Sequence, residues 1–132
     1  MAKILLKEKL SENVFKMKLE AKLIAEERKA GQFIILQIDE DLGERIPLTI
    51  ADADIIEGSI TIIFQVVGLT TLELSKLNKG DEIPVLVGPL GNPTHIKKHG
   101  TVVCVGGGIG VAPLHPIAQA LKKAGNKVII IM

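Results

Sequence analysis

Four glycines stand close together where their backbone could hold a phosphate. Gly106, Gly107, Gly108 and Gly110 follow the apolar run 101–105 and precede a segment with helical periodicity. Glycines let a ligand approach backbone N–H groups closely, and the N-terminus of a following helix favours negative charge. The spacing does not match the dinucleotide fingerprint G-x-G-x-x-G/A in any register. A tight turn explains one or two glycines, so the loop predicts a nucleotide or pyrophosphate site.

The segment from Arg45 to Thr49 combines a cation, a proline and a hydroxyl group. An arginine near the start of a strand can pair bidentately with a phosphate. Pro47 has no backbone N–H, so the strand must lie at a sheet edge or be distorted, which leaves room for a flat ligand. The alternative is an ordinary edge strand with a surface arginine, and the segment by itself leaves both interpretations open.

Gly68, Thr70 and Thr71 form a second candidate anion site at the start of a short helical pattern. Free N–H groups and two hydroxyls at a helix N-terminus suit a phosphate. Thr70 followed three residues later by Glu73 is also a capping-box pattern, which explains Thr70 equally well. By itself this segment favours neither interpretation, and the turn at 88–91 is expected to be a simple loop.

The other reactive side chains do not form a catalytic or metal site. Cys104, the only cysteine, lies in an apolar run and is expected to be a small core residue, and one cysteine excludes a disulfide scaffold. His95, His99 and His115 lack metal spacing together with carboxylates. We therefore predict cofactor binding, with no catalytic side chain and no metal ligands.

Residues 1–98 carry short strand patterns separated by Gly and Asp turns. Alternation of apolar and polar residues predicts a strand at 14–20. Apolar runs bounded by Gly and Asp turns predict further strands at 32–38, 46–51, 59–67 and 82–87. A helix at 71–77 directs Leu74 and Leu77 towards the core. This pattern predicts a mainly β fold, either a small antiparallel barrel or a sandwich.

Residues 99–132 have a different character. The uninterrupted apolar run 101–105 predicts a parallel strand covered on both faces, and 127–132 predicts a second buried strand. A helix between them carries Pro113 near its first turn, and Gly125 stands where a C-terminal cap belongs. This β–α–β unit begins a doubly wound sheet but cannot bury both of its faces, so we expect an incomplete domain.

Composition excludes several classes of function. The chain has 132 residues, 47% of them apolar, with a net charge of +1 and only three aromatic residues. Disorder and nucleic-acid binding are therefore excluded. The N-terminal apolar run is too short for a signal peptide, and no stretch approaches the length of a membrane helix, so we expect a soluble, cytoplasmic protein.

Taken in order, these segments resemble the ferredoxin–NADP reductase superfamily, and within it the small flavoprotein subunits of sulfide dehydrogenases and of dihydroorotate dehydrogenases. The resemblance covers essentially the whole chain. Its strongest parts are Gly31-Gln32-Phe33, Arg45-x-Pro47-Leu48-Thr49, Gly80-Asp81, Gly88-Pro89-Leu90-Gly91 and Val105 to Pro113.

The resemblance implies a Greek-key barrel that binds FAD, followed by a pyridine-nucleotide domain. It places Arg45 at the FAD pyrophosphate, Pro47 and Leu48 beside the flavin ring, and Thr49 near the reactive nitrogen. It further implies electron transfer from NAD(P)H through FAD to an iron–sulfur partner, either a larger catalytic subunit or ferredoxin. The remaining implied contacts are the FAD phosphates for Gly68, Thr70 and Thr71, and the NAD(P)H site for Gly107, Gly108 and Gly110.

The sequence departs from the family pattern in three respects. Ile46 separates the arginine from the following motif, and Leu48 occupies the usual aromatic position. The family's domain continues for roughly another hundred residues. The cysteine cluster that binds a [2Fe–2S] centre in the family is absent, and Cys104 cannot belong to it.

These departures lead us to expect a truncated form that binds FAD, turns over NAD(P)H poorly alone, and self-associates through its uncovered strands. The main alternative is a flavin-free barrel that acts as a scaffold or interaction module. A free-standing mononucleotide-binding fragment centred on the glycine loop is a third and weaker interpretation, because too little sheet remains around it.

Overall fold

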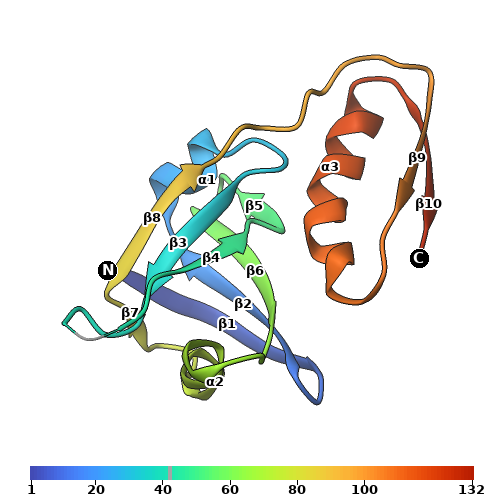
Figure 1. Cartoon of the computed structure of the whole chain (residues 1–132). Coiled ribbons are helices and arrows are strands. Elements are labelled where there is room, and N and C mark those ends of the chain that lie inside the picture. The colour runs from blue at the N-terminus through green and yellow to red at the C-terminus, as the bar shows by residue number, and fades with distance from the viewer. Residues whose placement is uncertain (42) are drawn as a thin grey trace.

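A computed structural model describes residues 1–41 and 43–132, and it shows two antiparallel sheets around one core with a smaller α/β unit beside them (Figure 1). The first sheet has the strand order β5-β6-β2-β1-β7, and the second has the order β4-β3-β8. The mainly β fold expected from the sequence is confirmed. The strands of these sheets are β1 (Ala2–Ser11), β2 (Val14–Glu20), β3 (Phe33–Gln37), β4 (Ile46–Thr49), β5 (Asp52–Asp54), β6 (Ser59–Gln65), β7 (Glu82–Ile83) and β8 (Val85–Leu90).

Strand β2 illustrates why this sequence closes around a core. Met17 and Leu19 are fully buried and pair with the buried residues Ile62 and Ile60 of β6. Because side chains alternate across a strand, Lys16 and Lys18 face outwards. Burying each large aliphatic side chain stabilises the fold by about 1.5–3 kcal/mol. The same core includes Ile4, Ile34, Leu36, Ile50, Phe64, Leu74 and Ile83.

The barrel contains elements that the sequence patterns do not indicate. The expected strand 82–87 is divided at Pro84: β7 pairs with β1, whereas β8 pairs with β3 in the other sheet. Proline cannot donate a hydrogen bond to a ladder, so the chain changes sheets at this point. The long strand β1 and the short helix α1 (Lys22–Glu27) are also found where the sequence analysis assigns no element.

Helix α2 (Leu69–Lys76) begins two residues earlier than expected, with Gly68 as its N-cap. The expected capping role of Thr70 is wrong, because Thr71 performs it. The Thr71 hydroxyl accepts hydrogen bonds from the N–H groups of Val67 at 2.9 Å and Gly68 at 3.0 Å. Leu74 is fully buried and Leu77 packs against the core, as the apolar pattern predicts.

The last segment forms the expected β–α–β unit. Strands β9 (Thr101–Val105) and β10 (Lys127–Ile131) are parallel, and helix α3 (Val111–Lys123) packs on one face of the pair. Gly125 has a φ of +96° and follows the helix, as a C-terminal cap requires. The expectation that 101–105 is covered on both faces is wrong, because Val103 and Val105 are 54% and 70% exposed.

Candidate functional site

Strand β4 forms the edge of the three-stranded sheet and presents the segment after Arg45. It pairs with β3 on one side, with Pro47 opposite Ile35 and Thr49 opposite Phe33. Because β4 is an edge strand, the edge position predicted from this proline is confirmed. The free side of β4 is therefore available to a ligand.

A cavity of about 440 Å³ lies between β4, β6, the start of α2 and the start of α3. Most of its lining residues are apolar, and the polar ones are Thr49, Gln65 and Thr71. Five of the predicted cofactor-binding residues meet here, although they come from three separate segments of the chain. These residues are Pro47, Leu48, Thr49, Thr71 and Gly110.

Arg45 does not line this cavity. Its side chain is exposed, and its Nε–H donates a hydrogen bond to Oε1 of Gln37 at 3.3 Å. The Gln37 amide in turn donates to the carbonyl oxygen of Gly43 at 2.7 Å. Gln37 thus ties Arg45 to the loop before β4, while the cavity beside β4 remains open.

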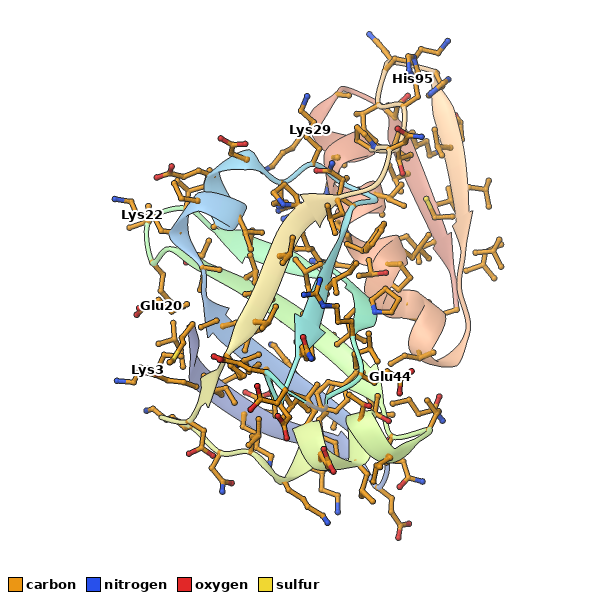
Figure 2. All side chains as sticks on the ribbon, turned by 60° about the vertical axis from the view of Figure 1, so that its left-hand side comes forward. Lys3, Glu20, Lys22, Lys29, Glu44 and His95 are labelled. Atoms are coloured by element: carbon orange, nitrogen blue, oxygen red, sulfur yellow. The ribbon has the colours of Figure 1, made fainter. Side chains whose placement is uncertain are left out.

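The N-terminal end of α2 lies at one end of this cavity. The carboxylate of Glu44, from the segment before β4, lies beside it, and the sequence patterns do not reveal this neighbour. The Thr70 hydroxyl donates a hydrogen bond to Oε2 of Glu44 at 3.3 Å, and Figure 2 shows Glu44 next to this end of the helix. A Cβ added to Gly68 would meet no atom within 4 Å, so its backbone is open to approach. Glu44 and Thr70 are separated by 26 positions, so no local pattern could predict their contact.

The glycine loop is open on the side away from α3. A Cβ on Gly107, Gly108 or Gly110 would meet no atom within 4 Å, which is the space a ligand needs. A Cβ on Gly106 would instead lie 2.8 Å from the Leu114 side chain, so this glycine is explained by packing against the helix. Gly108 has a φ of +56° within a short 3-10 turn, η1 (Gly108–Gly110).

A second and larger cavity, of about 790 Å³, adjoins the first one. It lies over the outer face of β2 and β6, and Gly108 is the only residue of the predicted site in its wall. Gly107 lines neither cavity. The residues common to both cavities are Ile63, Gln65, Ile109 and Ala112.

The chain does not offer a metal centre in the parts described. Within residues 1–41 and 43–132, no three His, Cys, Asp or Glu side chains are grouped as metal ligands. Cys104 is buried against α3 and is a free thiol, as expected for a core residue. None of the helices described is long and apolar enough to span a membrane.

Solved structures identify the class of protein to which this fold belongs. The chain aligns over 98% of its length with the NADH-dependent reduced ferredoxin–NADP oxidoreductase, with a TM-score of 0.95 and 45% identity, covering 47% of that chain. The ferredoxin reductase of carbazole 1,9a-dioxygenase has the same fold, with a TM-score of 0.83, 20% identity and coverage of 99% of this chain and 42% of that one. No family model matches the sequence. The chain therefore has the ferredoxin reductase fold and is similar in sequence over 98% of its length to a NADH-dependent reduced ferredoxin–NADP oxidoreductase.

The curated relatives of this chain include electron-transfer subunits of dihydroorotate dehydrogenase B. The chain is 46% identical over 129 residues, 98% of this chain and 45% of the relative, to a homologue of the electron-transfer subunit of dihydroorotate dehydrogenase B from Thermotoga maritima. The electron-transfer subunit from Fusobacterium nucleatum is 37% identical over 93% of this chain and 49% of its own length. The chain is thus a homologue of these electron-transfer subunits, and it spans about half the length of the curated relatives it matches.

Proposed function

We propose that this chain is a flavoprotein component of an oxidoreductase that passes electrons between NAD(P)H and an iron–sulfur partner through FAD. The observation that carries the proposal is the cavity between β4, the start of α2 and the glycine loop, in a chain with the ferredoxin reductase fold. NAD(P)H acts as substrate in this proposal. FAD supplies the chemistry, because it accepts a hydride and can release electrons singly.

The cavity suits the flavin ring. Leu48 and Ile109 provide aliphatic walls for a planar ring, and Thr49, which lines the same cavity, carries a hydroxyl that can form a hydrogen bond with the ring edge. Pro47 leaves the edge of β4 without a competing donor. In this proposal Gly107, Gly108 and Gly110 form the surface that NAD(P)H approaches.

The start of α2 suits the FAD phosphates. Gly68, Thr70 and Thr71 lie at the helix N-terminus, where the backbone N–H groups and the helix dipole favour an anion. Arg45 would reach the pyrophosphate only by exchanging its contact with Gln37, which its exposed position allows. Glu44 must leave the phosphate side of Thr70 or bind a sugar hydroxyl instead.

The 132 residues contain one cysteine, which cannot by itself supply the thiolates that a [2Fe–2S] cluster requires. The iron–sulfur partner in this proposal is either a larger catalytic subunit or ferredoxin. We assign FAD binding to 1–98 and the start of a pyridine-nucleotide unit to 99–132, and we place the protein in the cytoplasm. The exposed β9–β10 face would support self-association or pairing with a partner.

A flavin titration tests the proposal. The purified chain should be yellow with close to one FAD per chain, or should take up added FAD, and Arg45→Ala combined with Thr49→Ala should lose the flavin absorbance. Lys9→Ala, on the exposed face of β1, is the matched control and should retain the colour. A colourless chain that fails to take up FAD would support the alternative of a scaffold or interaction module, for which the exposed Val103 and Val105 provide a surface.

A further inference from the structure

The larger cavity adjoins the proposed flavin site, and most of its wall comes from residues to which that proposal gives no role. It lies between the outer face of β2 and β6 and the start of α3, which Figure 1 shows standing beside the barrel. No residue of β4 or α2 lines it. Its volume of about 790 Å³ is within the range of cavities that bury small molecules, roughly 300–1,000 Å³.

One wall of this cavity is a regular platform on the outside of the barrel. Its side chains alternate with core residues, so they project together from the sheet. The cross-strand partners are close enough to form one surface. The platform consists of three pairs from β2 and β6, namely Val14 with Gln65, Lys16 with Ile63, and Lys18 with Thr61.

The opposite wall comes from the glycine loop and the first turns of α3. It includes Ile109, Val111 and His115. Ile63 on the platform and Ile109 on the loop both belong to the cavity, so an apolar ring has aliphatic surface on two sides. The Gln65 side chain has no hydrogen-bond partner among the residues that the structure describes, and its amide can donate to and accept from a ring edge.

The two lysines in the wall of this cavity differ in whether a carboxylate neutralises them. Lys18 forms an ion pair with Glu57 at 3.7 Å, whereas Lys16 has no ion pair with any described residue although its side chain is half-buried. A partly desolvated cation without a counter-charge favours an anionic ligand. Asp52 is the only acidic residue of the wall, and its ion pair with Arg28 and its hydrogen bond from the Ala53 N–H both use Oδ1.

We propose that this cavity binds a purine nucleoside 5′-monophosphate, at a site separate from the flavin cavity. The purine lies between Ile63 and Ile109, with its hydrogen-bonding edge read by the Gln65 amide, a pairing that glutamine makes well with adenine. The phosphate binds Lys16. Oδ2 of Asp52 accepts a hydrogen bond from a ribose hydroxyl, which explains a carboxylate in an otherwise basic wall.

The site does not require FAD in the smaller cavity, although the two share a wall. Ile63, Gln65, Ile109 and Ala112 contribute to both cavities. A nucleotide at the platform therefore contacts the loop that closes the flavin site from its other side. Simultaneous binding of both ligands is the expected behaviour, with each changing the affinity for the other by the same factor.

Calorimetric titration of the 132-residue chain with AMP tests the proposal, with adenosine and inorganic phosphate as comparison ligands. AMP should bind at least about tenfold more tightly than either, because neither fills the whole site. Lys16→Met should weaken AMP binding about tenfold, the loss of one charge-assisted contact. Lys9→Met, which removes an exposed lysine from β1 outside the cavity, should not change the AMP affinity.

A steric variant and a competition experiment complete the test. Val14→Phe should fill the cavity and abolish AMP binding, while both Val14→Phe and Lys16→Met keep the thermal midpoint and the FAD uptake of the parent chain. The proposal is overturned if AMP does not bind in the millimolar range, if Lys16→Met binds AMP as well as the parent, or if FAD displaces AMP in direct competition. Loss of FAD binding with AMP binding retained would contradict only the flavin proposal.

Discussion

Replacing Gly110 with alanine separates ligand binding from stability. Gly110 has φ and ψ of −62° and −15°, a right-handed conformation that alanine adopts without strain, and a Cβ there would meet no atom within 4 Å. Alanine also restricts the unfolded chain more than glycine does. We therefore expect Gly110→Ala to raise the free energy of unfolding by about 0.4–1 kcal/mol.

The same methyl group should weaken the binding of FAD. Gly110 lines the 440 Å³ cavity, so the added carbon occupies space beside the flavin. Inserting a methyl group into a packed contact typically costs about 1–3 kcal/mol. Since 1.4 kcal/mol corresponds to a factor of ten, the dissociation constant for FAD should rise about tenfold.

Urea unfolding without FAD and equilibrium dialysis with FAD measure the two effects separately. Gly91→Ala is the contrasting variant, because Gly91 has a φ of +86° and its Cβ would lie 2.7 Å from the Phe33 ring. That variant should lose stability, while its folded fraction binds FAD as the parent does. Unchanged FAD affinity in Gly110→Ala would refute the placement of the flavin against the glycine loop.

Two further variants test contacts that position the site. Thr71→Val removes the acceptor for the Val67 and Gly68 N–H groups, so urea unfolding should show a free energy of unfolding lower by about 1–2 kcal/mol. Thr71→Ser keeps the hydroxyl and should restore most of the loss. An unchanged urea midpoint for Thr71→Val would contradict the capping role. Asn126 is 6% exposed, and its side chain accepts hydrogen bonds from two backbone N–H groups and donates to two carbonyl oxygens. Asn126→Ala should therefore lower the free energy of unfolding by about 1–3 kcal/mol for each buried group left unpaired and accelerate hydrogen exchange at Gly100, with Asn126→Asp intermediate. Unchanged hydrogen exchange in Asn126→Ala would contradict this role.

Local patterns were sufficient where a strand or helix is defined by its own residues. The alternation in 14–20 predicts β2 with the observed bounds, because Met17 and Leu19 need a core on one face only. The positive φ of Gly125 and the edge position of Pro47 follow in the same way from what those residues permit. The α/β character of 99–132 depends on equally local signals.

Local patterns failed where a distant partner decides the outcome. The pattern of Thr70 and Glu73 favours Thr70 as the capping residue, but in the structure the Thr71 hydroxyl takes that role and the Thr70 hydroxyl contacts Glu44, which is distant in the sequence. The run 101–105 indicates burial on both faces, but whether a second layer covers a strand is a property of neighbouring elements.

The sequence by itself determined the type of fold, the family resemblance and five of the residues that line the smaller cavity, because these depend on residue type and local spacing. The tertiary structure decided which of these residues meet. It brings Leu48, Thr71 and Gly110 to one cavity, leaves Arg45 outside its wall, and opens a second cavity over Lys16 that no motif indicates. The physical reason is that a cavity is defined by surfaces from several strands and a helix, and their relative placement is set by packing of the whole core.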